Sequence, residues 1–241
     1  MSINWNVQNQ QVHRAWSGAQ RFGVWLLAAT SIACLMTEFY QVCPMRTFTL
    51  AIFIPALIIL AVWTGFDAVR VHRIFVPVMI GAVSGLLAAV SYDIFRLPFV
   101  FSKQWGLTGI VPALNLYKVF PAFGAMILGQ PYPQAEYQLS AELLGWAYHF
   151  SNGLTFGVMY LAMVGNPLKR HWAWAVVFAV GLELAMLFTP YPKAFGIPVT
   201  STFVWATLTA HLIFGVAMGL ISRRLWARFE APRAISPLQA A

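Results

Sequence analysis

Four ionisable residues lie within apolar stretches of this chain and are its best candidates for chemistry. They are Asp93, His149, Glu183 and His211. An ionisable side chain at the centre of a bilayer costs roughly 2.5 to 3.5 kcal/mol on insertion scales, so it usually faces the protein interior and often belongs to a functional site. We therefore take these four residues as the core of a candidate site.

Each of the four continues a row of small residues at four-residue spacing. The rows are Gly81, Gly85, Ala89 and Asp93; Gly145, His149, Gly153 and Gly157; Ala175, Ala179 and Glu183; and Thr207, His211, Gly215 and Gly219. On an α-helix this spacing places residues on one face, and small residues line the faces where membrane helices approach closely. The spacing therefore predicts that the four ionisable groups face one another between helices.

Three kinds of chemistry fit such a group. In the first, Asp93 and Glu183 capture a cation or a proton, and His149 and His211 relay it, because histidine titrates near neutral pH. In the second, His149, His211 and Glu183 hold iron, zinc or manganese. In the third, the two histidines hold a b-type haem. A purely structural role also fits, in which hydrogen bonds among the groups only hold the helices together.

The preferred function is the binding or movement of a small solute, an ion or a proton. A metal- or haem-binding membrane oxidoreductase is the alternative, and a structural subunit of a membrane complex is the third hypothesis. Four further residues extend the predicted path: Arg96 one turn after Asp93, Lys118 at the mouth, Glu142 two turns before His149, and Asn152 near that histidine.

The composition points to one broad class of protein. Of the 241 residues, 60% are hydrophobic and 9% are charged, and the mean hydropathy is +0.70. This leaves too little polar surface for a soluble domain of this length. We expect an all-α integral membrane protein that contacts the lipid bilayer.

Six apolar stretches are long enough to cross a hydrocarbon layer of about 30 Å. They cover residues 22–42, 48–66, 74–97, 138–163, 171–190 and 199–222. The expected fold is a six-transmembrane-helix bundle in one membrane domain, residues 22–222. A polar cytoplasmic N-terminus (1–21) precedes it, and a basic, partly disordered tail (223–241) follows. Pro55 and Pro77 predict kinks.

The connection between the third and fourth spans, residues 98–137, is too apolar for a solvated loop. Prolines interrupt it, and aromatic residues such as Phe99, Trp105 and Phe120 are spread along it. We expect an outer interfacial or re-entrant segment, which acts either as a lid over the site or as a plug.

The basic residues predict the orientation. If both termini are cytoplasmic, that side carries ten of the fifteen Lys and Arg residues, which fits a bacterial-type plasma membrane. The net charge of +8 then reflects orientation and attraction to anionic lipid. The charges are spread over several segments, so no nucleic-acid partner is expected. A chain this small is expected to form a homo-oligomer or to join a membrane complex.

Helix positions also predict how the site is arranged. Counting about 1.5 Å per residue from the outer helix ends puts His149 and His211 level, with Asp93 and Glu183 nearer the outer surface. The expected arrangement is a path that descends from outside. The chain contains no P-loop, GxGxxG before a helix, GxSxG or paired CxxC, so no motif names a family.

Overall fold

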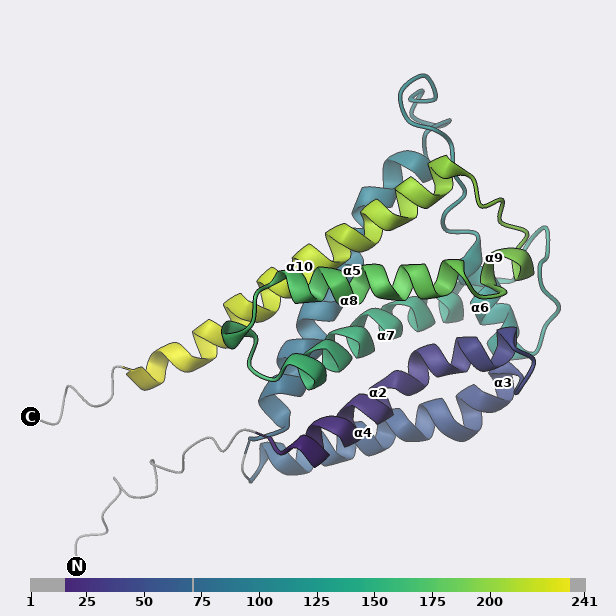
Figure 1. Cartoon of the computed structure of the whole chain (residues 1–241). Coiled ribbons are helices and arrows are strands. Elements are labelled where there is room, and N and C mark those ends of the chain that lie inside the picture. The colour runs from purple at the N-terminus through teal and green to yellow at the C-terminus, as the bar shows by residue number, and fades with distance from the viewer. Residues whose placement is uncertain (1–15, 71, 235–241) are drawn as a thin grey trace, which may run out of the picture.

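The computed structural model describes residues 16–70 and 72–234, and these residues form helices with no β-strand among them. The elements are α2 (Gly18–Phe39), α3 (Met45–Phe48), the π-helical turn η1 (Thr49–Phe53), α4 (Ile54–Ala68), α5 (Phe75–Val100), α6 (Val119–Leu128), α7 (Leu139–Val164), the 3-10 turn η2 (Pro167–Lys169), α8 (Ala173–Leu187), α9 (Tyr191–Ala194) and α10 (Ser201–Ala234). The start of α2 and the end of α10 lie at the same end of the bundle (Figure 1). The all-helical prediction is confirmed.

Four helical stretches are long and apolar enough to cross a membrane. They are Gly18–Phe39, Met45–Ala68, Phe75–Val100 and Ser201–Glu230. Helix α7 has 26 residues, but its polar residues, among them His149 and Asn152, lower its hydropathy. Helix α8 is apolar but has only 15 residues, about 22 Å at the usual rise. The chain is therefore a helical membrane protein, although length and composition identify four of the six predicted spans.

The outer surface of the bundle is apolar, as contact with lipid requires. Val62 and Phe66 on α4 are 65% and 56% exposed, and Val177 on α8 is 61% exposed. In water such a surface would be a strong aggregation hazard. Together with the helix lengths, this exposed apolar surface indicates that these helices contact lipid.

Helix α7 occupies the centre of the bundle. It packs against α5, α6 and α2, whereas α10 packs against α5 and α8, and α4 lies against α2 and α5. Helices α7 and α8 meet near the end of the bundle where α2 begins and α10 ends, because Phe178 of α8 contacts Phe156 and Tyr160 of α7 with ring centroids 6.4 and 6.3 Å apart. Away from that end they enclose the site described below.

The rows of small residues lie where the helices touch, as the spacing predicts. A Cβ added to Gly81 of α5 would lie 2.8 Å from the carbonyl oxygen of Gly157 on α7. One added to Gly219 of α10 would lie 2.6 Å from the Trp172 carbonyl oxygen just before α8. Larger side chains would separate these helices, so the small residues set the distances that bring the ionisable groups together.

The segment from 98 to 137 is less superficial than expected. Helix α5 continues to Val100, and α6 is a ten-residue helix whose residues Val119–Met126 are all buried. A Cβ on Gly124 of α6 would lie 2.8 Å from the backbone nitrogen of Gly145 on α7. Helix α6 is therefore part of the core, because its close packing on α7 removes it from the surface. A re-entrant path is not confirmed.

Two prolines have different local effects. The π-helical turn Thr49–Phe53 ends two residues before Pro55. This turn accommodates the backbone N–H that the proline lacks, so the helical stretch remains continuous. Pro77 lies in the first turn of α5, where a backbone N–H has no intrahelical partner anyway. The effect of Pro55 is therefore confined to this turn, and Pro77 fits the start of α5 without a kink.

At the end of the bundle where α2 begins and α10 ends, several charged residues bind backbone groups. Oδ2 of Asp67 accepts hydrogen bonds from the backbone N–H groups of Ile74 and Phe75 at 2.7 and 2.8 Å. Nε of Arg21 donates to the Ala162 carbonyl at 2.7 Å, and Nη1 of Arg223 donates to the Pro167 carbonyl at 2.8 Å. These bonds satisfy helix ends that would otherwise lack partners.

Helix α10 also changes the predicted domain limits. It continues to Ala234, so the first part of the predicted tail (223–241) is helical. Residues 1–15 and 235–241 lie outside the described residues, as does most of the predicted N-terminal segment.

Candidate functional site

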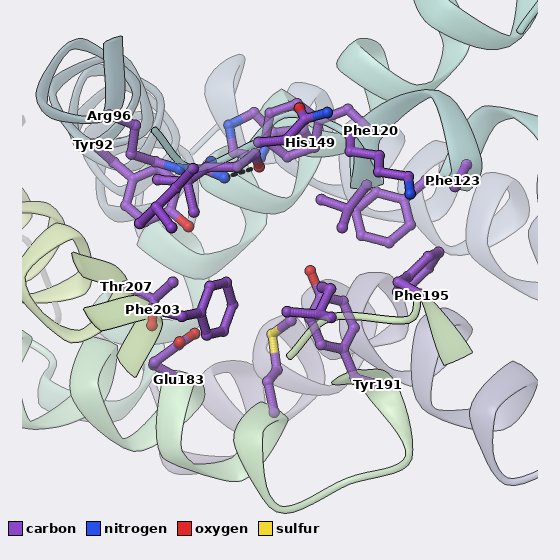
Figure 2. Close-up of a pocket in the computed structure, with 18 of the residues that line it drawn as sticks. Tyr92, Arg96, Phe120, Phe123, His149, Glu183, Tyr191, Phe195, Phe203 and Thr207 are labelled. Carbon is purple, nitrogen blue, oxygen red and sulfur yellow. Dashed lines mark hydrogen bonds between the residues drawn. The ribbon is translucent and has the colours of Figure 1, made fainter. Parts of the chain in front are cut away.

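A cavity of about 420 Å³ lies between α5, α6 and α7 on one side and α8, α9 and α10 on the other. Its walls are largely aromatic and aliphatic, and Figure 2 shows several of the side chains that form them. Those labelled include Phe120, Phe123, Tyr191, Phe195 and Phe203. The volume falls in the range of small-molecule pockets, roughly 300 to 1,000 Å³.

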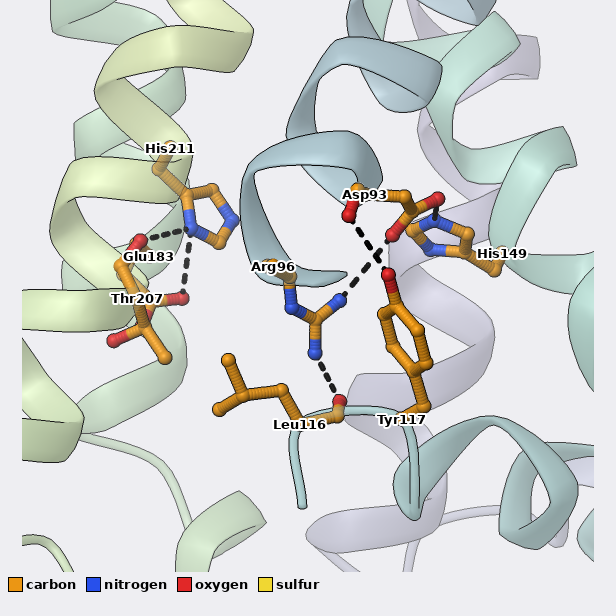
Figure 3. Close-up of polar contacts among 8 residues, drawn as sticks. All are labelled: Asp93, Arg96, Leu116, Tyr117, His149, Glu183, Thr207 and His211. Carbon is orange, nitrogen blue, oxygen red and sulfur yellow. Dashed lines mark hydrogen bonds and ion pairs between the residues drawn. The ribbon is translucent and has the colours of Figure 1, made fainter. Parts of the chain in front are cut away.

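Asp93 is the centre of a polar cluster on one side of this cavity. Its Oδ2 lies 2.8 Å from Nε2 of His149, and its Oδ1 lies 3.4 Å from Nη1 of Arg96. Nη2 of Arg96 donates to the Leu116 carbonyl, and the Tyr117 hydroxyl donates to the backbone carbonyl of Asp93 at 2.7 Å. Figure 3 shows how this cluster joins α5, α7 and the chain before α6.

Glu183 and His211 form a second pair on the opposite wall. Oε2 of Glu183 lies 3.3 Å from Nδ1 of His211, and the same nitrogen lies 3.0 Å from the Thr207 carbonyl oxygen. Glu183 is only 5% exposed. The pair joins α8 to α10 (Figure 3).

The hydrogen-bond partners determine the protonation of the two imidazole rings. Nδ1 of His211 faces a carbonyl oxygen and a carboxylate, which are both acceptors, so Nδ1 carries a proton. Nε2 of His149 faces the Asp93 carboxylate and therefore also carries a proton. In the neutral rings, Nε2 of His211 and Nδ1 of His149 are then free to accept a proton or a hydrogen bond.

The Tyr92 side chain separates the two polar clusters. Its ring centroid lies 4.9 Å from that of His211 and 6.0 Å from that of His149, and the Arg96 guanidinium carbon lies 4.7 Å from it. Phe120 stacks on His149 with centroids 4.2 Å apart. These aromatic contacts hold the histidines and the guanidinium in fixed positions.

Tyr117 connects the chain before α6 to the site. Burial raises the pKa of Tyr117 to about 12, and the nearby Asp93 carboxylate acts in the same direction. The hydroxyl therefore stays protonated at neutral pH and continues to donate to the Asp93 carbonyl. This bond holds the segment that precedes α6 against α5.

The eight residues proposed from the sequence occupy different places. Six line the cavity: Arg96, Lys118, His149, Asn152, Glu183 and His211. Asp93 lies directly behind His149 and Arg96 and is bonded to both. Glu142, in the first turn of α7, is not among the lining residues. Asn152 contributes a buried Oδ1 that has no partner among the described residues.

The predicted metal set is not assembled. Among residues 16–70 and 72–234, no three His, Cys, Asp or Glu side chains gather closely enough to hold a metal ion. His149 pairs with Asp93 and His211 pairs with Glu183, with the Tyr92 ring between the two. The described residues therefore do not show the metal site that the sequence suggested as an alternative.

The predicted depths are also wrong. Asp93 was expected well above His149, yet their side chains are 2.8 Å apart. Counting residues from the helix ends compares the depths of two side chains correctly only when their helices are parallel and end at the same level. Here α5 extends to Val100, and the helices are inclined to one another (Figure 1). The polar groups form two carboxylate–histidine pairs, Asp93 with His149 and Glu183 with His211.

Several site residues could not be assigned from sequence patterns. Tyr92 is next to Asp93 in the chain but belongs to none of the small-residue rows. Tyr117, Phe120 and Tyr191 lie in the connections between the predicted spans, where no helical spacing predicts what they face. The only available signal was the aromatic content of the segment from 98 to 137. The Leu116 carbonyl is a backbone group, which no side-chain pattern could identify.

Comparison with known proteins leaves the site as the main guide to function. No protein-family model, no curated protein and no solved structure matches this chain.

Proposed function

We propose that the chain is a six-span membrane protein that binds a small, largely apolar molecule with a polar group. The single observation that carries this proposal is an aromatic-walled cavity of about 420 Å³ that is lined by the Glu183–His211 pair and by His149, the partner of Asp93. Pockets of this kind commonly bind a ligand body through apolar contacts and orient it through a few polar groups.

The arrangement of charge favours a molecule over a bare ion. Arg96 lines the cavity and is 4% exposed, so a fixed positive charge lies inside the site. A metal or alkaline-earth ion needs several oxygen or nitrogen ligands around it. The aromatic walls instead match an organic molecule, and the free histidine nitrogens can exchange a proton with its polar group.

The path of the chain supports six crossings. The start of α2 and the end of α10 lie at one end of the bundle (Figure 1), which requires an even number of crossings. Four stretches qualify by length and hydropathy. Helix α7 lies between α5 and α2, and adding α7 alone would give an odd number, so α8 completes six.

The basic residues support one orientation of this bundle. The end where α2 begins and α10 ends holds the Arg21 and Arg223 bonds described above, and the helix ends and connections there carry most of the Lys and Arg residues of the described chain. By the positive-inside rule this end is cytoplasmic. The cavity, at the other end, then opens toward the outside of a bacterial-type plasma membrane.

The test is whether a tryptophan placed in the cavity blocks small-molecule binding. Met186 lines the cavity, so Met186→Trp fills part of it. Leu184 is 40% exposed and does not line it, so Leu184→Trp is the matched control on the same helix. Binding would be measured by isothermal titration calorimetry in a mild detergent, with benzyltrimethylammonium, 2-methyl-1-phenyl-2-propanol and phenylacetate as probes.

We expect at least one probe to bind saturably to the wild type and to Leu184→Trp. Met186→Trp should weaken that binding at least about tenfold, equivalent to about 1.4 kcal/mol. Saturable binding that is equal in both tryptophan variants would place the ligand elsewhere. Absence of saturable binding for all three probes in folded protein would refute the proposed function.

A further inference from the structure

We propose that the bound molecule is an organic cation, either a protonated amine or a quaternary ammonium on an apolar body, with its charged group beside Glu183. This inference rests on the proposed function and specifies the ligand class of the same cavity. It starts from a difference between the two carboxylates that flank the site.

The two carboxylates have different counter-charges. Asp93 has a permanent cation, because Arg96 lies 3.4 Å away, and it also meets His149 at 2.8 Å. Among the described residues, Glu183 has no Lys or Arg within ion-pair distance, and its one charged partner is His211 at 3.3 Å. When His211 is neutral, the Glu183 wall therefore carries an uncompensated negative charge.

The hydrogen bonding of Glu183 is also incomplete. The His211 Nδ1 proton is shared with the Thr207 carbonyl, which lies closer, at 3.0 Å. In the described part of the chain only Oε2 of Glu183 has a partner, although the residue is 5% exposed. A buried carboxylate is costly unless it is paired and hydrogen-bonded. A cation bound in the cavity would supply the missing partner.

The surroundings of Glu183 suit an organic cation. In Figure 2 its carboxylate points into the cavity beside Phe203, and Tyr191 and Phe195 form the wall across from it. Aromatic faces attract ammonium groups, and they also pack against an apolar body. A bare inorganic cation would gain little from such walls, since it would lose its water without gaining enough oxygen ligands.

Arg96 does not prevent this binding. Its guanidinium donates to the Leu116 carbonyl, pairs with Asp93 and lies against the rings of Tyr92, Tyr117 and Phe120. The Tyr92 ring lies between it and His211. The positive charge is thus compensated on its own side of the cavity.

The experiment compares three probes of similar shape and different charge. Benzyltrimethylammonium is a cation, 2-methyl-1-phenyl-2-propanol is neutral, and phenylacetate is an anion. Titrations would be run in detergent at pH 8, where an ordinary histidine is neutral, with wild type, Glu183→Gln and Glu136→Gln. Glu136 is an exposed acid in the chain before α7 and does not line the cavity.

We expect the cation to bind the wild type and Glu136→Gln at least about tenfold more tightly than the neutral probe. Glu183→Gln should abolish this preference while it leaves the neutral probe's affinity within about twofold. Detergent stability of Glu183→Gln, measured by thermal unfolding, shows whether the variant is folded.

Three results would overturn the inference. Equal binding of the cation and the neutral probe, or a preference for phenylacetate, would reject an organic cation as the ligand. The proposed function would still stand if Met186→Trp blocks the binding that is seen. Cation binding that is unchanged in Glu183→Gln would reject the role of this carboxylate. Failure of all three probes in folded wild type would overturn the proposed function as well.

Discussion

The two ends of the helical bundle use the same kinds of charged residue in different ways. At the end where α2 begins and α10 ends, Asp67 binds the first backbone N–H groups of α5 and Arg21 binds the last carbonyls of α7. At the other end, Arg96, Glu183 and His211 line a cavity. Charged groups at the first end are bonded to backbone, whereas some at the second face space that a ligand can fill.

This difference separates structural charges from candidate functional ones. Asp67 is 9% exposed and Glu183 is 5% exposed, so burial alone does not distinguish them. Asp67 accepts two backbone hydrogen bonds near 2.8 Å, but Glu183 has a single contact, at 3.3 Å. A buried acid with unfilled hydrogen-bonding capacity is the better functional candidate.

Gly85→Val should have the largest effect, because it prevents the close contact between α5 and α7 on which both ends of the bundle depend. A side chain at Gly85 would overlap the main chain of Gly153 and Gly157 on α7. We expect loss of folded protein, measured as monodisperse yield in detergent. Gly181→Val is the control, since a Cβ at Gly181 meets nothing within 4 Å. A normal yield of Gly85→Val would contradict the close α5–α7 packing.

Asp93→Asn should be the next most damaging change, because it leaves the buried Arg96 cation without its counter-charge. Removing one partner of a buried ion pair typically costs about 3 to 5 kcal/mol. The free energy of unfolding, from titration with sodium dodecyl sulfate in mixed micelles, should fall by about 3 kcal/mol. The double variant Asp93→Asn with Arg96→Gln should recover part of this loss. No recovery would mean that the pair is not the source of the effect.

Asp67→Ala should have a moderate effect confined to stability. It removes the acceptor of two backbone N–H groups at the start of α5, and the loss of such a cap costs about 1 to 2 kcal/mol. The same unfolding titration measures this. Probe affinity in the folded variant should match wild type, and a change in that affinity would show that the two ends of the bundle are not independent.

Glu183→Gln should have the smallest effect on stability. The carboxylate has one contact at 3.3 Å and is buried, so removing its charge relieves about as much desolvation cost as it loses in attraction. We expect the free energy of unfolding to stay within about 0.5 kcal/mol of wild type or to rise. A loss as large as that of Asp93→Asn would assign Glu183 to the structural charges.

The sequence was informative where periodicity and composition determine structure. Gly81, Gly85, Gly153 and Gly157 were predicted to lie on faces where helices approach closely, and the structure brings their backbones together. Arg96 was predicted to extend the site one turn after Asp93, and the two side chains do pair, since three residues on a helix bring side chains together. The same spacing rule could not show that Gly145 packs on α6, because α6 lies in a segment without clear helical periodicity.

The partners of the four ionisable residues were less predictable. Each row identified a helix face but not the helix across from it, so a metal site shared by His149, His211 and Glu183 was one of the alternatives. The structure instead pairs Asp93 with His149 and Glu183 with His211. The inclination and packing of the helices determine which residues pair, and both arise from contacts among distant parts of the chain.

The sequence by itself determined that this is a helical membrane protein with ionisable groups on its small-residue faces, because hydropathy and four-residue spacing are local properties of the chain. Only the tertiary structure decided that these groups form two separate pairs around an aromatic cavity. That arrangement depends on the angle between helices and on the buried position of α6. Long-range packing sets both, and no local pattern encodes them.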